Sequence, residues 1–350
     1  MRINILLPDI VRAPAGGHKV IYEYSNRLVE DGHQVTLCFF PGNIFSKFHL
    51  YEPIRLWLAK LYGQMIGPAE WFKLDKRIKK QVVFDAKELC DADVVIATGI
   101  CTAQPVYKLP SEKGKKVYFI QDFENWEYTD DEVFESYSYG MCNIAVSQWL
   151  KDIVDAHSAY PCHLVSNGIN TQIFKPMNLP RVKHSIAFHY RSGEYKGGKY
   201  ALETISLLAK RYDDLVVYVV SSEVKQPELL PCCKYLFNIS ADEVARINNS
   251  AEVFMCSSVS EGYGLPGLEA MACGAALATT EYAGSKEYAI DRENALLSRV
   301  KDSVAMAENI TALFEDEELR SQISATGVKT GIEHSLDKSY VVFKQILCNL

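Results

Sequence analysis

Short runs of aliphatic and β-branched residues alternate along this chain with stretches in which apolar residues recur at helical spacing. Residues 3–7 form such a run, and residues 18–32 carry an approximate apolar stripe that ends at a glycine, where a helix C-terminus is expected. A second run follows at residues 33–40. This order of strand, loop, helix and strand predicts a βαβ unit with parallel strands.

The same alternation continues to the C-terminus and sets the fold class. Runs of β-branched residues between amphipathic stretches favour an α/β fold over an all-β protein or a helical bundle. Further strands are expected at residues 93–97, 117–120, 143–146, 185–189, 215–220, 253–256 and 275–279, and helices at residues 198–212, 241–250, 268–274 and 336–350.

The length of the chain predicts two domains. It has 350 residues, of which 48% are hydrophobic, so each half can bury a core of its own. Residues 170–184 contain two prolines, several polar residues and no periodicity, as expected of a boundary. We therefore expect an N-terminal domain over residues 1–172 and a C-terminal domain over residues 173–333.

Charge and cysteine usage exclude several classes of protein. The formal net charge of −7 argues against nucleic acid as a partner. The ten cysteines contain no CxxC pair, so no metal site is expected. Asp91 and Asp93 resemble a DxD metal motif, but they precede a buried strand, where acidic residues commonly end a turn. The apolar N-terminus is too short for a signal segment, which predicts a cytoplasmic protein.

Residues 257–274, SSVSEGYGLPGLEAMACG, are the most informative stretch. They follow a predicted strand and open a predicted helix. Gly262 and Gly264 allow the backbone to approach a ligand closely, and Pro266 suits the first position of a helix. The free N–H groups at the start of that helix favour an anion, for which a diphosphate is the natural occupant.

Two carboxylates flank this turn. Glu261 and Glu269 would repel a phosphate, so they are more plausible partners for hydroxyl groups. The alternative is that one caps the helix and Glu269 is solvated. Arg191 and Lys196 lie in a loop before the helix expected at 198–212, where they could neutralise charge on a leaving diphosphate, or form a solvated basic loop.

Residues 261–274 agree almost letter for letter with the run E-G-[FY]-G-L-P-x-L-E-A-M-A-x-G, and the chain thereby resembles the family 4 retaining glycosyltransferases of GT-B fold. The resemblance implies two Rossmann-like, doubly wound domains facing across a cleft. It implies an acceptor-binding N-terminal domain, a donor-binding C-terminal domain, and a final helix, 336–350, that returns to the first domain.

The resemblance also implies roles for individual residues. Glu261 would contact the donor sugar and Glu269 the nucleotide ribose, while Arg191 and Lys196 would grip the diphosphate. Glu261, Arg191 and Lys196 are thus the candidate catalytic residues. The candidate donor-binding residues are Gly16, Gly17, Arg191, Lys196, Gly262, Tyr263, Gly264, Leu265 and Glu269.

The implied reaction moves a sugar from a nucleoside-diphosphate sugar to a hydroxyl of a glycan or lipid-linked acceptor, as in the synthesis of surface polysaccharides or glycoconjugates. No cofactor and no essential metal are expected. Two alternatives remain open. The chain could be a non-catalytic sugar-nucleotide-binding subunit, or a nucleotide-sugar epimerase of the same fold.

The N-terminal half supplies further candidates for sugar or acceptor contacts. Gly16, Gly17 and His18 follow the first strand, where a glycine pair suits close contact with a ligand or a plain tight turn. Gln121 ends a strand at which similar enzymes often carry a histidine, and an amide cannot act as a general base. Asp122 and Glu124 could hold an acceptor hydroxyl or cap the loop. The run FIQDFE resembles a subgroup that includes rhamnosyltransferases.

Residues 44–80 differ from the rest of the chain. They contain eight basic and three acidic residues, with aromatic residues between them, in a chain that is otherwise acidic. Basic and aromatic amphipathic helices suit an anionic membrane surface. The segment therefore predicts peripheral association with the inner face of a membrane, or, equally, a core-facing helix pair with a solvated basic side.

Overall fold

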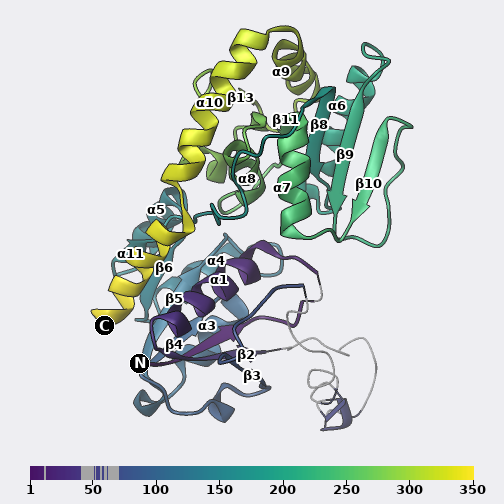
Figure 1. Ribbon diagram of the computed structural model, residues 1–350. Coiled ribbons are helices and arrows are strands. Elements are labelled where there is room, and N and C mark those ends of the chain that lie inside the picture. Colours follow the sequence, from purple (N-terminus) through teal and green to yellow (C-terminus); the bar gives the residue numbers. More distant parts are fainter. Residues whose placement is uncertain (12, 41–50, 52, 56, 59–60, 62–70) are drawn as a thin grey trace. The chain divides into compact units, whose positions relative to one another are not determined.

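The structure is a computed structural model that describes residues 1–11, 13–40, 51, 53–55, 57–58, 61 and 71–350. By its internal contacts the chain divides into unit 1, Met1–Val165 with Tyr340–Leu350, and unit 2, Ser166–Ser339 (Figure 1). The division precedes the expected boundary near residue 172. The reason is that Ile169 is bound to the end of unit 2, where its N–H donates to His334 O at 2.9 Å.

Unit 1 is built on a parallel sheet with the strand order β3-β2-β1-β4-β5-β6-β7. Neighbouring strands pair in parallel, so the chain must cross over between them, mostly through helices. The strands are β1 (Arg2–Leu7), β2 (Gln34–Phe39), β3 (Lys79–Val82), β4 (Val94–Ala97), β5 (Lys115–Ile120), β6 (Cys142–Ala145) and β7 (Cys162–Leu164).

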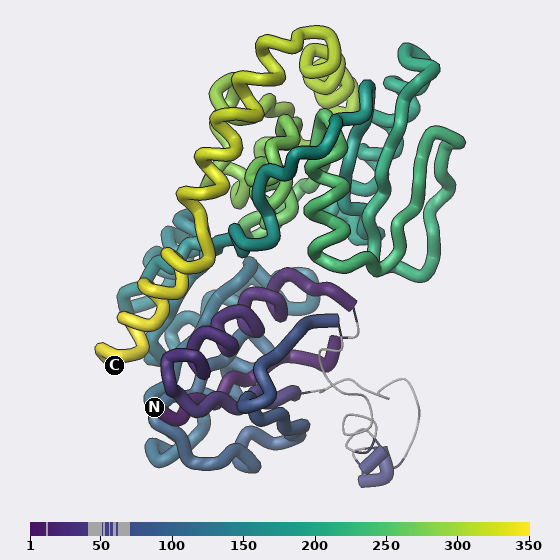
Figure 2. Tube along the Cα trace, in the orientation of Figure 1, coloured from purple at the N-terminus to yellow at the C-terminus, as the bar shows by residue number. Residues whose placement is uncertain are grey.

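The helices of unit 1 include the last helix of the chain, which lies beside the first (Figure 2). Phe343 stacks on Tyr24 with ring centroids 4.7 Å apart. Asp31, just after the first helix, accepts hydrogen bonds from Tyr340 Oη at 2.6 Å and Lys344 Nζ at 2.8 Å. The helices are α1 (Gly16–Glu30), α3 (Ile100–Tyr107), α4 (Asp130–Tyr137), α5 (Gln148–His157) and α11 (Leu336–Cys348), with 3₁₀ turns η1 (Ala86–Glu88) and η2 (Ser111–Lys113).

Unit 2 repeats this plan with a second parallel sheet in the order β10-β9-β8-β11-β12-β13. The predicted α/β class with parallel sheets is confirmed. The strands are β8 (Val182–His189), β9 (Val216–Ser221), β10 (Cys233–Phe237), β11 (Ala251–Cys256), β12 (Ala276–Thr280) and β13 (Ala295–Ser298). The helices are α6 (Gly198–Leu208), α7 (Ala241–Ser250), α8 (Leu265–Ala272), α9 (Ser303–Glu315) and α10 (Glu317–Glu333), with 3₁₀ turns η3 (Glu194–Lys196) and η4 (Ala283–Glu287).

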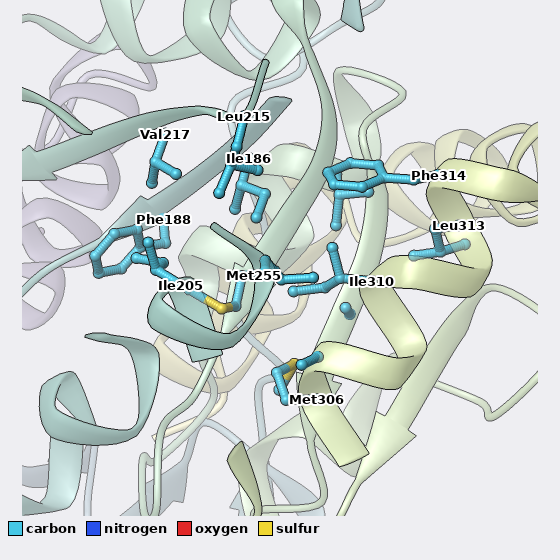
Figure 3. Close-up of a cluster of buried hydrophobic side chains, with 14 of the residues drawn as sticks. Ile186, Phe188, Ile205, Leu215, Val217, Met255, Met306, Ile310, Leu313 and Phe314 are labelled. Carbon is cyan, nitrogen blue, oxygen red and sulfur yellow. The ribbon is translucent and has the colours of Figure 1, made fainter. Parts of the chain in front are cut away.

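The period of two along a strand separates the core of unit 2 into two layers. In β8, Ile186 and Phe188 belong to the cluster that includes residues of α6 and α9 (Figure 3), whereas Ala187 faces the cluster with residues of α7 and α8. Both faces of the sheet are therefore buried, which explains why its central strands read as continuous apolar runs. Burial of each large apolar side chain contributes about 1.5–3 kcal/mol.

Several elements were not predicted from the sequence, and others begin at different residues from those expected. Strands β3 and β10, KKQV and CKYLF, lie at sheet edges with most residues at least partly exposed, so they lack an uninterrupted apolar pattern. Helix α8 begins at Leu265, three residues before the expected start. Gly264 adopts a left-handed backbone with φ of 91° and serves as its N-cap, so the chain turns earlier than the apolar pattern indicates.

Candidate functional site

Two loops at the carboxyl end of the unit 2 sheet bring together two of the predicted residues. One loop joins β8 to α6 and holds Lys196, and the other joins β11 to α8 and holds Glu261. Lys196 Nζ lies 3.5 Å from Glu261 Oε2, and both side chains are 18% exposed. Because the carboxyl ends of neighbouring parallel strands meet at one edge, residues distant in sequence form one charged pair.

Backbone hydrogen bonds hold these two loops against each other. The carbonyl of Tyr195 accepts from the N–H groups of Val259 at 2.8 Å and Ser260 at 3.1 Å. Ser257 Oγ donates to Gly197 O at 2.9 Å. Gly197 has a φ of 66°, and a Cβ there would lie 1.8 Å from Ser257 O. A side chain at this position would therefore separate the loops.

The carboxylate of Glu261 is held on both oxygens. Ser258 Oγ donates to Oε1 at 2.5 Å, while Oε2 faces Lys196. Ser258 is itself fixed, because Thr280 Oγ1 donates to its carbonyl at 2.5 Å. A carboxylate has about four acceptor sites, so Glu261 can still receive hydroxyl groups in an orientation set by these contacts.

The glycine turn before α8 rests on buried tyrosines. A Cβ on Gly264 would lie 1.9 Å from Tyr282 Oη, and the hydroxyl of Tyr288 donates to Gly264 O at 2.8 Å. Leu265 is the first residue of α8, so Pro266 occupies the second position rather than the first. Gly262 and Tyr263 complete the turn, and Tyr263 is 3% exposed.

Glu269 lies within α8 and is 5% exposed. The interpretation in which this side chain is solvated is therefore wrong. Burial of a carboxylate is costly unless polar partners compensate for the lost water. A buried glutamate at this position is therefore more consistent with a binding role than with a role in solubility.

Arg191 follows β8 and is partly buried. It lines a groove of about 830 Å³ together with Tyr190, Ser192 and Glu194. The backbone N–H of Ser192 donates to Glu223 Oε1 at 2.6 Å, which fixes the loop directly after the arginine. Lys196 and Glu261 do not line this groove.

The candidate residues of unit 1 gather at the carboxyl edge of its own sheet. Gly16 and Gly17 are the first two residues of α1. A Cβ on Gly17 would lie 3.1 Å from Gln121 Nε2, so the glycine pair and the glutamine adjoin. Gln121 Nε2 donates to Thr98 O at 3.4 Å, and Gln121 Oε1 is buried with no partner among the described residues. That acceptor is available to a ligand hydroxyl.

His18, in the first turn of α1, is 8% exposed, and its Nε2 lies 3.1 Å from Asp9 O. Burial lowers the pKa of the imidazole, although the Asp9 carbonyl and carboxylate oppose the shift. Burial of Asp9 likewise raises the pKa of its carboxyl, although the hydrogen bond that the carboxylate accepts from the Ile10 N–H lowers it. At neutral pH, His18 is thus available as a neutral hydrogen-bonding group.

Asp122 and Glu124 have local partners that fit the capping interpretation. Glu124 Oε2 accepts from the N–H of Ile100, the first residue of α3, at 2.5 Å. Burial raises the pKa of Glu124 to about 7, against the opposing effect of this bond. Asp122 Oδ1 accepts from the N–H of Phe123 at 3.0 Å. Both carboxylates lie near Gln121 in sequence, but one oxygen of each already accepts a hydrogen bond from a backbone N–H.

Several residues that build the site carried no recognisable signal in the sequence. Ser258 and Thr280 orient Glu261, while Tyr282 and Tyr288 support the glycine turn. The two tyrosines lie in EYAGSKEY, which has no spacing that distinguishes it from an ordinary polar loop. Their roles arise from contacts between segments, which a single sequence does not encode as a pattern.

Most of residues 44–80, the predicted membrane-facing segment, lie outside the described residues. In its described part, Trp71 and Phe72 pack on Tyr22 of α1, with ring centroids 5.5 and 5.4 Å apart. Trp71 Nε1 also donates to Val11 O at 3.0 Å. These two aromatic residues therefore face unit 1, as the core-facing interpretation expects, whereas Trp57 is 60% exposed.

The described residues lack the features that a metal site or a bilayer span requires. They contain no group of three or more His, Cys, Asp or Glu side chains arranged to hold a metal ion. Asp91 and Asp93 of the DxD-like motif pair with Lys113 and Arg2. Among the helices of the described chain, none is both long and apolar enough to span a membrane.

Comparison with known proteins points to one family. Residues 170–330 match the family described as glycosyl transferases group 1. An uncharacterized glycosyltransferase of Methanocaldococcus jannaschii is 24% identical over 224 residues, which are 58% of either chain. The Campylobacter jejuni protein named N-acetylgalactosamine-N,N'-diacetylbacillosaminyl-diphospho-undecaprenol 4-alpha-N-acetylgalactosaminyltransferase is 26% identical over 181 residues, 49% of this chain and 50% of its own. The chain thus spans about half of the length of these curated relatives.

The fold has a counterpart among solved structures. The Anabaena protein HepE, in complex with UDP-glucose, matches with a TM-score of 0.78 and 14% identity over 100% of both chains. At that identity the likeness concerns the fold alone. The fold is GT-B, which confirms the predicted fold class of two Rossmann-like α/β domains.

Proposed function

We propose that this chain, whose residues 170–330 match the group 1 glycosyl transferases, moves a sugar from a nucleoside-diphosphate sugar to a hydroxyl group with retention at the anomeric carbon. The observation that carries the proposal is the Lys196–Glu261 pair beside the glycine turn that opens α8. It combines a cation, a carboxylate and a helix N-terminus at the edge of one sheet. These are the groups that a sugar diphosphate requires.

In this proposal the leaving diphosphate binds between Lys196 and the start of α8. Negative charge grows on the diphosphate as the glycosidic bond breaks, and groups already aimed at that charge stabilise the transition state without reorganising. The free N–H groups of the first turn of α8 add to this stabilisation. Arg191 provides a second cation from the same loop as Lys196.

The two glutamates bind the hydroxyl groups of the donor, one at the sugar and one at the ribose. Glu261, held by Ser258 and Lys196, accepts hydroxyl groups of the transferred sugar. Glu269 accepts the ribose hydroxyls of the nucleotide. Such hydrogen bonds from neutral donors to a buried carboxylate are stronger than those between neutral groups.

Unit 1 is proposed to bind the acceptor, with Gly17, His18 and Gln121 near the reacting hydroxyl. Gln121 is not a base, so the leaving phosphate itself takes the proton of the acceptor. The acceptor is proposed to be a glycan or a lipid-linked sugar. In support, the Campylobacter relative is named for transfer to a diphospho-undecaprenol-linked saccharide. A rhamnose donor, suggested by the run FIQDFE, stays a prediction.

The cytoplasmic location and the contact of residues 44–80 with an anionic membrane are also proposals. Their direct test is co-sedimentation with vesicles of anionic phospholipid. Binding that falls as salt rises supports an electrostatic contact. Absence of binding at low salt excludes it.

The experiment that tests the proposed function is thermal-shift binding against UDP, GDP, dTDP, ADP and their sugars, with Lys196→Ala and Glu269→Ala alongside. Stabilisation by one nucleotide family, lost in both variants, supports the donor site. Product analysis by NMR with a matching acceptor then tests retention. A flat panel with folded protein contradicts the proposal and favours a subunit that does not bind nucleotide sugars by itself. Donor conversion without an acceptor favours an epimerase.

A further inference from the structure

The donor turn is bonded to a second part of unit 2 that the proposed chemistry does not use. A hydrogen bond joins Tyr263 Oη, in the turn before α8, to His334 Nδ1 at 2.8 Å. Tyr263 is 3% exposed, and its ring also packs on Tyr288 with centroids 5.8 Å apart. The hydroxyl of a buried tyrosine usually has a polar partner, and here it is bonded to a histidine side chain 71 residues along the chain.

His334 lies where the chain is about to leave unit 2. The chain passes between the units twice, and the ends of unit 2 at these passages are residues 166–169 and 334–339, here called the linker pair. The two segments are joined at His334, whose carbonyl accepts from Ile169 N at 2.9 Å, and at Leu336, whose N–H donates to Ile169 O at 2.8 Å.

Close packing makes this junction intolerant of displacement. Ile169 is 2% exposed, and it forms a bridge with Ser335. A Cβ on Gly168 would lie 2.5 Å from Ser335 O. The side chain of His334 therefore contacts the donor turn, while its carbonyl is bonded to Ile169 in the other linker segment. A shift of the donor turn or of residues 166–169 would thus displace His334.

We propose that Tyr263 is a positioning residue that couples occupancy of the donor turn to the linker pair through His334. The inference rests on the proposed function, because it takes the turn at residues 261–264 to be the donor site. A nucleotide sugar that orders this turn also fixes Tyr263 Oη, and thereby His334 and Ile169. The linker pair then holds one arrangement during transfer.

The choice of tyrosine supports this role. The resembling motif admits phenylalanine or tyrosine at this position, and either ring could pack against Tyr288. Tyr288, whose hydroxyl donates to Gly264 O, holds the glycine turn, whereas the hydroxyl of Tyr263 is bonded to His334.

The test combines hydrogen exchange with kinetics on the full chain. We compare wild type, Tyr263→Phe and His334→Gln, whose amide can still bond the tyrosine hydroxyl. The matched control is Tyr212→Phe, which removes a tyrosine hydroxyl bonded to Glu315 Oε1 at 3.0 Å, away from the donor turn. The probe is the nucleotide diphosphate that stabilises the wild type most in the panel above.

In the wild type and in Tyr212→Phe, nucleotide is expected to slow exchange in peptides covering residues 166–169 and 334–339. Tyr263→Phe is expected to lose that protection and about tenfold in kcat, the order expected for one hydrogen bond, while KM for the donor changes about twofold or less. His334→Gln, compared with wild type, is expected to keep most of the nucleotide-induced protection and most of kcat.

The outcomes separate the two proposals. If wild type binds nucleotide and Tyr263→Phe keeps the protection of the linker pair, the coupling is wrong and the donor site stands. The same conclusion follows if nucleotide leaves exchange in the wild-type linker pair unchanged. If wild type binds no nucleotide, the proposed function and the coupling fail together.

Discussion

Lys196 Nζ lies 3.5 Å from Glu261 Oε2, across two loops that are held together through the carbonyls of Tyr195 and Gly197. The pair is partly buried, and the second oxygen of the glutamate is bonded to Ser258. The lysine is thus already oriented toward the space beside the glycine turn. Such preorganisation is more important for catalysis than for stability, because charges fixed before the reaction need not reorganise during it.

We expect Lys196→Ala to lower kcat about 10²-fold or more, because it removes one preorganised charge from the leaving group. Steady-state kinetics with the donor identified by binding measures this effect. The control is Lys151→Ala, which also removes a lysine paired with a carboxylate, that of Asp155, but on α5 of unit 1. Equal losses in the two variants would show that Lys196 acts through general stability rather than through the reaction.

Gly264 is the position where a single methyl group should be most harmful to the donor turn. Gly264→Ala places a Cβ 1.9 Å from Tyr282 Oη at a φ of 91°. The matched control is Gly32→Ala, which has a φ of 84° and open space around the added carbon. Gly32→Ala should lower the free energy of unfolding by about 1–2 kcal/mol because of its backbone conformation alone. Gly264→Ala should lower it by clearly more, because a steric conflict is added. Urea unfolding measures both, and equal costs would contradict the predicted steric conflict.

The sequence predicted those parts of the protein that depend on local pattern. The strands buried on both faces, such as residues 253–256, appear as apolar runs, and the glycines with the flanking glutamates mark the turn before α8. Edge strands such as β10 were missed because half-exposed residues show no such run. The start of α8 was misplaced because a left-handed glycine, rather than hydrophobicity, decides where the helix begins.

The supporting residues of the site could not be predicted for a different reason. Tyr282, Tyr288 and His334 act through contacts with segments far away along the chain. Their residue types are common in structural roles, and one sequence does not show which distant segment each contacts. The pairing of Lys196 with Glu261 was expected as a shared site, but its ion pair follows from strand order, which the alternation of elements does not specify.

Glu124 makes the stability of unit 1 depend on pH. Burial raises its pKa to about 7, so the protonated form is favoured in the folded state. Because the folded pKa lies above the unfolded value near 4.3, this contribution is present below pH 4 and is lost as pH rises through about 7. The resulting loss of stability is about 4 kcal/mol at most.

We therefore expect Glu124→Gln to become progressively more stable relative to wild type as pH rises from 5 to 8. The amide can still accept from Ile100 N–H, so the cap of α3 is kept while the buried charge is removed. Urea unfolding of both proteins across this range tests the prediction. A constant difference between them would show that the carboxylate does not titrate there.

The attachment of α11 to unit 1 gives the last prediction. Phe343 is 1% exposed and stacks on Tyr24, whereas its neighbour Val342 is 41% exposed on the same helix. Phe343→Ala should lower the free energy of unfolding by about 3–5 kcal/mol, because it leaves a cavity against α1. Val342→Ala should change it by less than about 0.5 kcal/mol, as exposed substitutions usually do. If Phe343→Ala were as mild as Val342→Ala, helix α11 would not be an integral part of unit 1. The hydrogen bonds from Tyr340 and Lys344 to Asp31 would then be dispensable contacts on its surface.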